Sequence, residues 1–173
     1  IIFSFLKKVV TKMLRMKNMF LLILIHSLYW TTLQLLIAHV GTKIPLSFFK
    51  KTYLFFEPCQ WENQGGIWNR LFKVDKWKKW IPEGSKINNN IYDKSKLNFR
   101  TDDIHNLLLE MRRTELIHWI SILPVLIFGH APRYIKWINV VYMCVSHVPI
   151  IITQRYNRPR VAQLIRLRER RGR

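Results

Sequence analysis

The stretch MFLLILIHSLYWTTLQLLIAHVG, residues 19–41, decides the fold class of this chain. It contains no Lys, Arg, Asp or Glu over 23 positions. A helix of this length, rising about 1.5 Å per residue, crosses a hydrocarbon core about 30 Å thick. The stretch therefore predicts a transmembrane or signal-anchor helix. A cleaved signal peptide also has a basic start and an apolar run, although Ala38-His39-Val40 is a poor cleavage site.

A second apolar region follows later in the chain, and Arg133 and Lys136 divide it into the segments 116–131 and 134–153. The first segment is short and contains Pro124. It therefore crosses thinly, tilts against a neighbour, or enters the membrane and returns on the same side. With the first stretch, these segments predict an all-α membrane protein with about three apolar helical segments.

Cations dominate the charge of the chain, with 29 Lys and Arg against 10 Asp and Glu, a formal net charge of +19. Five cations precede Met19, 14 lie between Thr42 and Glu115, two lie in the predicted hairpin turn and eight follow Thr153. Cations that flank apolar spans mark the cytoplasmic face and bind anionic lipid headgroups. The pattern therefore favours anionic membrane lipids over nucleic acid as partners.

The number of crossings decides which side of the membrane each basic region faces. Both large basic regions are cytoplasmic if segments 116–131 and 134–153 supply two crossings between them. The amino-terminal orientation stays open, because one crossing by residues 19–41 places the first five cations outside, unless the stretch 44–56 returns the chain. We expect a multi-pass or signal-anchored protein with its large basic regions in the cytoplasm.

These boundaries predict one domain with five segments. The chain begins on Ile1 rather than Met, so its true start residue stays open. The segments are a basic start at 1–18, the span 19–41, an interfacial region at 42–100, a helix running into a membrane hairpin at 101–153, and a basic end at 154–173.

The two cysteines, Cys59 and Cys144, have neither the spacing of a disulfide framework nor that of a zinc site. No metal site is expected. A nucleophilic Cys59 remains an alternative.

The interfacial region mixes tryptophan with cations, as headgroup-level segments of membrane proteins do. Anchoring at the interface is the expected role of most of these rings, and a minority would instead stack against a sugar. The tryptophans are Trp61, Trp68, Trp77 and Trp80, which alternate with Arg70, Lys73, Lys76, Lys78 and Lys79.

A helix is predicted from Thr101, which can cap it, with Asp102 and Asp103 beside the positive end of its dipole. An apolar stripe at helical spacing runs to Met111 and continues onto Glu115 and then His118. A buried face that changes from leucine to an acid and an imidazole predicts a polar pocket at the membrane edge.

The alternative to a functional pocket is a structural one. Glu115 would then pair with Arg112 or Arg113, and His118 would hydrogen-bond a backbone carbonyl within the bundle. The pattern alone leaves both interpretations open.

The last apolar segment leads into Gln154-Arg155-Tyr156-Asn157-Arg158-Pro159-Arg160, a dense set of donors at the membrane exit. Its three arginines suit phosphate, whose oxygens match the guanidinium fork, in a lipid or in a coenzyme A-type donor. Pro159 suits the first turn of a further helix, which would lie in the interface.

Long motifs in a fixed order are more specific than any of these spacings. Through them the chain resembles the glycosyl-4,4'-diaponeurosporenoate acyltransferases, which complete staphyloxanthin-type carotenoid pigments, over nearly its whole length. The motifs are Leu28-Tyr29-Trp30, Ala38 to Pro45, Trp68-Asn69-Arg70, Val74 to Lys78, Asn90-Ile91-Tyr92-Asp93, Arg113 to Pro124, Val148 to Ile151, and Gln154 to Arg160.

The resemblance implies an acyltransferase that esterifies the glucose 6-hydroxyl of a membrane-held glycosyl carotenoid with a fatty acyl chain. It implies the bacterial cell membrane as the location, with no bound cofactor. The acyl donor, acyl-CoA or acyl carrier protein, would be a co-substrate. Other enzymes of the carotenoid pathway are further expected partners.

The roles of individual residues come from the chemistry of acyl transfer, which needs a base for the hydroxyl and donors for the oxyanion. We assign His118 as the base and Glu115 as the residue that orients it. Binding of substrate or acyl carrier is assigned to Arg113, Arg155, Asn157, Arg158, Arg160, Trp68 and Trp77.

A second hypothesis belongs to a different class of function. The chain would then be a non-catalytic subunit that binds the carotenoid glycoside, or assembles a pigment complex, while a partner performs the chemistry.

Overall fold

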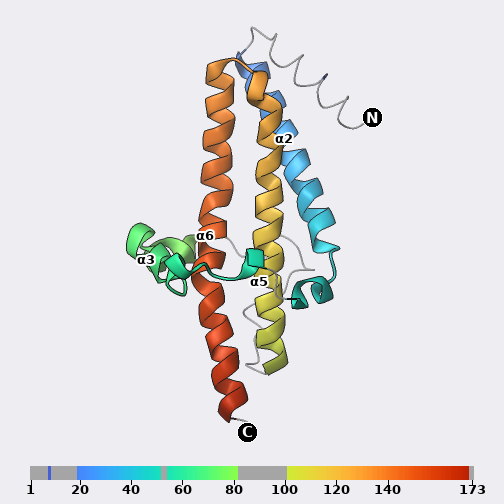
Figure 1. Cartoon of the computed structure of the whole chain (residues 1–173). Helices are drawn as coiled ribbons and strands as arrows, with labels where there is room; N and C mark the ends of the chain where they lie inside the picture. Colours follow the sequence, from blue (N-terminus) through green and yellow to red (C-terminus); the bar gives the residue numbers. More distant parts are fainter. Residues whose placement is uncertain (1–7, 9–18, 52–53, 82–100, 172–173) are drawn as a thin grey trace.

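The computed structural model describes residue 8 and residues 19–51, 54–81 and 101–171, and the regular structure in these ranges is entirely helical. Long helices lie side by side in Figure 1: α2 (Met19–Thr42), α5 (Thr101–Ile122) and α6 (Arg133–Arg171). α2 and α6 run in one direction, and α5 runs in the other, packed along α6 and against α2. The predicted all-α class is confirmed over the described residues.

Some predictions concern parts of the chain outside the described residues. They include the basic start at 1–18 apart from residue 8, residues 82–100 of the predicted interfacial region, and the capping side chain of Thr101. α5 begins at Thr101, the residue at which the sequence predicts a helix to begin.

Two of the described helices, α2 and α6, are long and apolar enough to cross a membrane. Both turn large apolar side chains away from the bundle. Leu28 and Leu35 of α2 expose 66% and 60% of their surface, and Val145 of α6 exposes 70%.

The predicted apolar segment 116–131 does not form a helix of its own. Its first part is the end of α5, and the 3-10 helix η7 (Leu123–His130) continues from there with Pro124 in its first turn. Proline has no N–H to donate to the carbonyl four residues earlier, so the α-helix gives way to a tighter turn. Of the roughly three predicted apolar segments, two are therefore the long helices α2 and α6, and the third is divided between the end of α5 and η7.

α6 continues through Pro149 and Pro159, so the prediction that Pro159 begins a separate interfacial helix is wrong. Pro159 has no N–H to give to the carbonyl of Arg155. The next carbonyl, that of Tyr156, accepts a hydrogen bond from the guanidinium of Arg160. Side-chain contacts in this turn thus support a helix that the local sequence predicts to break.

At one end of the bundle a cluster of buried aromatic and aliphatic side chains joins α2, η7 and α6. Trp30 of α2, Phe128 of η7 and Met143 of α6 are members of this cluster. The indole nitrogen of Trp30 donates a hydrogen bond of 2.6 Å to Oδ1 of Asn139 on α6. The amino-terminal end of α2 and η7 lie at this same end of the bundle in Figure 1.

Short helices between α2 and α5 form a connecting layer, residues 46–51 and 54–80, which packs on the other half of the bundle. Phe49 and Phe56 pack against Leu109 of α5, while Val74 packs against Ile152 and Tyr156 of α6. The elements are η1 (Leu46–Lys50), η2 (Leu54–Phe56), η3 (Gln60–Glu62), α3 (Gly66–Phe72), α4 (Val74–Trp77) and η4 (Lys78–Trp80).

Gly65 lies where the connecting layer approaches the backbone of α6. Its φ is +82°, and a Cβ added there would lie 2.9 Å from the carbonyl oxygens of both Arg155 and Tyr156. We expect Gly65→Ala to lower the free energy of unfolding by about 2 kcal/mol, because a side chain in this backbone region and a backbone clash both cost energy. Thermal unfolding in detergent micelles measures the effect.

Gly66→Ala is the matched control, since a Cβ there meets only Nδ2 of Asn63, at 3.6 Å. Equal losses of stability in the two variants would contradict the role given to Gly65.

Candidate active site

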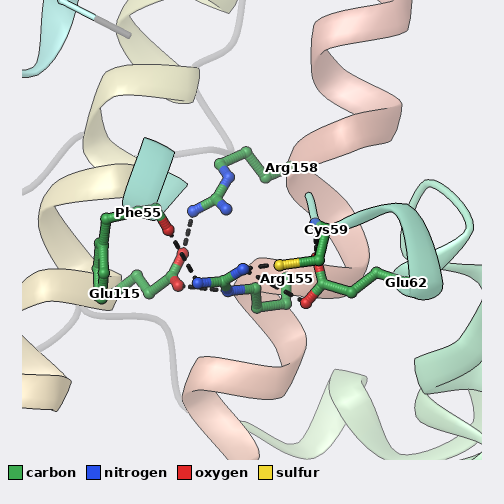
Figure 2. A network of polar contacts seen from close by, with 6 residues as sticks. All are labelled: Phe55, Cys59, Glu62, Glu115, Arg155 and Arg158. Carbon is green, nitrogen blue, oxygen red and sulfur yellow. Dashed lines mark hydrogen bonds and ion pairs between the residues drawn. The ribbon is translucent and has the colours of Figure 1, made fainter. Parts of the chain in front are cut away.

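Glu115 lies at the centre of a buried network of charges between α5 and α6 (Figure 2). Its Oε1 accepts a hydrogen bond of 2.6 Å from Nε of Arg155, and its Oε2 accepts one from Nη1 of Arg158. The side chain of Glu115 is fully buried and that of Arg158 nearly so. A carboxylate so far from water is stable only because both of its oxygens are paired with cations.

Arg155 links this pair to the connecting layer. Its Nη1 lies 3.3 Å from Oε1 of Glu62, and its Nη2 donates a hydrogen bond of 2.9 Å to the carbonyl of Phe55. Glu62 is also buried, and its Oε2 accepts a hydrogen bond of 3.0 Å from the backbone N–H of Cys59. The two carboxylates and the two guanidinium groups therefore have a net charge of zero. We call these residues the arginine–glutamate network: Glu62, Glu115, Arg155 and Arg158.

Arg113 holds the chain where it leaves α2. Its Nη1 donates to the carbonyls of Thr42 and Ile44, at 3.1 and 3.3 Å, and its Nη2 pairs with Glu110 at 2.6 Å. Burial raises the pKa of the Glu110 carboxyl, and the charge of Arg113 partly opposes the rise. Arg113, predicted to bind substrate, is thus engaged in joining α5 to the end of α2.

Arg112 makes a similar contact one residue earlier. Its Nη1 donates a hydrogen bond of 2.8 Å to the carbonyl of Phe49 in η1. Burial lowers the pKa of the Arg112 guanidinium, and the charge of Glu57 opposes the decrease. Both arginines before Glu115 therefore satisfy backbone carbonyls of the chain that follows α2.

His118 has a partner that the sequence did not predict. Its Nδ1 lies 2.8 Å from Nδ1 of His147 on α6, and the two rings are tilted by 50°. His147 is 5% exposed, and its Nε2 is buried without a hydrogen-bond partner among the described residues. The one available signal was a single imidazole within the apolar segment 134–153, whose neighbour only the packing of α5 on α6 reveals.

The predicted orientation of His118 by Glu115 is not what the structure contains. Both oxygens of Glu115 are bonded to arginines of α6, and His118 bonds to His147 instead. The physical reason is that a fully buried carboxylate gains more from charged guanidinium donors than from a neutral imidazole. The inward direction predicted for Glu115 is correct, because its side chain has no exposed surface.

The remaining arginine of the predicted phosphate motif has different surroundings. Arg160 is exposed and stacks on the ring of Tyr156 at 3.7 Å from its centroid. Nζ of Lys78 lies 4.9 Å from the same centroid and donates a hydrogen bond of 3.2 Å to Oδ1 of Asn157. Within the described residues no carboxylate forms an ion pair with Lys78 or Arg160. The charges of these two cations are therefore not neutralised by the protein and can attract an anionic ligand.

The two predicted tryptophans lie in the connecting layer beside Ile152 and Tyr156 of α6. Trp77 donates its indole N–H to the carbonyl of Phe72 at 2.7 Å. Trp68 stacks on Phe72, and its indole nitrogen is buried without a partner among the described residues. Both rings therefore pack the layer onto α6. Over the same part of the chain, His, Cys, Asp and Glu form no group of three or more suited to a metal ion.

Comparison with known proteins gives a consistent result. The family model for glycosyl-4,4'-diaponeurosporenoate acyltransferase matches residues 50–167. A protein of that name from Staphylococcus haemolyticus (strain JCSC1435) is 48% identical over 149 residues, covering 86% of this chain and 87% of the relative. One from Staphylococcus aureus (strain USA300) is 50% identical over 147 residues, covering 84% and 89%. No solved structure matches the chain.

Proposed function

Because the chain belongs to the glycosyl-4,4'-diaponeurosporenoate acyltransferase family, we propose that it esterifies the glucose 6-hydroxyl of that glycosyl carotenoid with a fatty acyl chain. The product would be a staphyloxanthin-type pigment. The observation that supports a site for this chemistry is the pair of His118 and His147, whose Nδ1 atoms lie 2.8 Å apart between α5 and α6.

His118 is the proposed base. As the glucose oxygen attacks the acyl carbonyl carbon, Nε2 of His118 takes the hydroxyl proton. The new C–O bond forms, the bond from the acyl carbon to the donor's leaving group breaks, and His118 returns the proton to that group. Nε2 of His118 has no hydrogen-bond partner among the described residues, so this nitrogen is available for a substrate hydroxyl.

The proposed location is the bacterial cell membrane. The apolar side chains that α2 and α6 turn outward would face lipid, as Leu28 and Val145 do. The arginine–glutamate network would then lie at the membrane boundary, and the charged ends of α5 and α6 would face the cytoplasm beside anionic headgroups. This arrangement places His118, one turn of α5 beyond Glu115, just inside the apolar region.

The carotenoid tail would lie among the apolar helices. A cavity of about 390 Å³ between α2 and α6 is suited to part of it, because apolar pockets of a few hundred Å³ bind such ligands. Trp30, Ile138 and Tyr142 line this cavity.

The acyl donor would bind through a phosphate at Lys78, Asn157 and Arg160. Arg155 and Arg158, which the sequence pattern also favoured for phosphate, are bonded to Glu115, and Arg158 is buried. Lys78 and Arg160 both lie against the ring of Tyr156, and Asn157 adds an amide group next to Lys78. Acyl-CoA and acyl carrier protein both carry phosphate, which charge-assisted donors of this kind bind.

We expect Arg160→Ala to raise the KM for the acyl donor roughly tenfold and to change kcat much less. The reason is that one charge-assisted hydrogen bond to phosphate contributes about 1.5 kcal/mol. Steady-state rates at varied donor concentration, with the glycoside saturating, measure the split. Arg166→Ala is the control, since Arg166 is an exposed cation two turns further along α6. Equal changes in the two variants would mean that only general surface charge matters.

The function itself is tested by product analysis. Cells that make the carotenoid glycoside but lack this protein should accumulate the glycoside, and the wild-type chain should convert it to the ester. Membranes containing only this protein are then supplied with the glycoside and either fatty acyl-CoA or acyl carrier protein loaded with the same chain. Ester formation supports the enzyme, whereas binding of the glycoside without ester from either donor supports a binding or assembly subunit.

A further inference from the structure

We propose that His147 is the positioning residue for His118, the role that the sequence pattern assigned to Glu115. The proposal rests on the proposed function for the base role of His118, but the hydrogen bond on which it depends can be tested separately. It is carried by the 2.8 Å contact between the Nδ1 atoms and by the burial of His147.

The contact restricts the protonation of the pair. Two neutral imidazoles that meet through their Nδ1 atoms share one hydrogen bond, so one Nδ1 carries the proton and the other accepts it. If His118 donates, its Nε2 keeps a free lone pair and can take a proton from a substrate. If His118 accepts, its Nε2 carries a proton and cannot act as a base. Only the first arrangement supports the proposed chemistry.

If Nδ1 of His118 is the donor, the protonation of His147 is determined as well. With its Nδ1 accepting, His147 must carry its proton on Nε2, which is buried without a partner among the described residues. An unpaired buried N–H is costly, so a substrate or oxyanion oxygen that reached it would be stabilised. His147 therefore fixes the tautomer and ring direction of His118, as the acid does in a hydrolase triad.

The charged groups nearest to the pair leave it undisturbed. Glu115 lies one turn earlier on α5, Arg155 is the cation of α6 nearest to His147 along the chain, and Arg158 follows Arg155 about one turn later. Both arginines donate hydrogen bonds to Glu115. Among the described residues no carboxylate contacts either imidazole, so the partner of His118 is a neutral acceptor.

Three substitutions at His147 separate positioning from simple packing. Asn places an amide oxygen near the former Nδ1 and should retain most activity. Leu removes the acceptor, and we expect kcat to fall on the order of 10²-fold. Asp supplies a carboxylate that stabilises the imidazolium form of His118. The acidic limb of the kcat/KM profile should therefore move to higher pH. His130→Asp is the control, because His130 is exposed on η7.

These rates are measured in membranes that hold the full chain, and thermal unfolding of each variant records its stability. An active His147→Leu variant, or a His147→Asp profile that superimposes on that of wild type, would overturn the proposal. If His147→Leu does not fold, the Asn and Asp variants still decide. If His147→Asp folds normally and the acidic limb of its kcat/KM profile does not move, His147 only packs α6 on α5.

A second measurement does not depend on enzyme activity. The chain has six histidines, and nitrogen-15 labelling of their rings in detergent micelles reports which nitrogen of each carries the proton. We expect His118 to be protonated on Nδ1 with a bare Nε2, and this state to be lost in His147→Leu. His118 protonated on Nε2 would refute the positioning role. If instead the tautomer is as expected but wild type forms no ester with either donor, only the proposed function fails.

Discussion

Replacing His118 by alanine is expected to reduce ester formation by 10²- to 10⁴-fold, roughly the contribution of a positioned general base. The glycosyl carotenoid should accumulate in its place, because binding of the glycoside does not require the imidazole. Extraction of pigments from cells that carry the variant as their only copy, followed by chromatography, gives the ratio of ester to glycoside.

His118→Gln tests the same role with a side chain that keeps hydrogen-bonding capacity but cannot take up a proton at neutral pH. It should be nearly as inactive as the alanine variant. His39→Ala is the matched control, since His39 is an exposed histidine near the end of α2. Full pigment yield from a well-expressed His118→Ala variant would rule out His118 as the base and leave it a structural residue of the bundle.

Replacing Glu115 by glutamine is expected to lower the free energy of unfolding by about 3–5 kcal/mol, the usual cost of removing one partner from a buried ion pair. The substitution keeps the size of the side chain but leaves the charges of Arg155 and Arg158 facing each other. Burial makes this loss large, because Glu115 has no exposed surface to admit water. Thermal or denaturant unfolding of the variant in detergent micelles measures the change.

The control for Glu115 is a polar contact between the same two helices at the surface. His105 of α5 lies 3.4 Å from Glu169 of α6, and both side chains are about half exposed. Glu169→Gln should change stability by less than about 1 kcal/mol. A double variant, Glu115→Leu with Arg158→Met, should be more stable than Glu115→Gln, because it removes one buried negative charge together with one buried positive charge. Equal stability of Glu115→Gln and Glu169→Gln would contradict the structural role of the network.

These two predictions divide the motif Arg112 to Trp119 into two functions. Its first part, up to Glu115, bonds α5 to α6 and to the connecting layer through arginine and carboxylate groups. His118, one turn later, faces a second imidazole and has no hydrogen bond to that network within the described residues. Variants of Glu115 should therefore act mainly on stability, and variants of His118 mainly on the rate of acyl transfer.

Features that depend on neighbours within the chain were predictable from the sequence. The run without charge at 19–41 lies in α2, and the apolar stripe that follows Thr101 lies in α5. The inward direction of Glu115 followed from helical spacing, and the family followed from long motifs in order. Helix propensity and apolar length are properties of short stretches, and motif order is read along the chain, so none of the three requires knowledge of how distant segments pack.

Features that depend on distant segments were decided only by the tertiary structure. The partners of Glu115 lie 40 and 43 residues away on α6, and the partner of His118 lies 29 residues away on the same helix. Spacing along α5 showed that Glu115 and His118 are neighbours. It could not show that Glu115 would bond to two guanidinium groups of another helix rather than to the imidazole beside it. A buried carboxylate bonds to the strongest donors that the packing of other helices places within reach, and the sequence alone does not show how the helices pack.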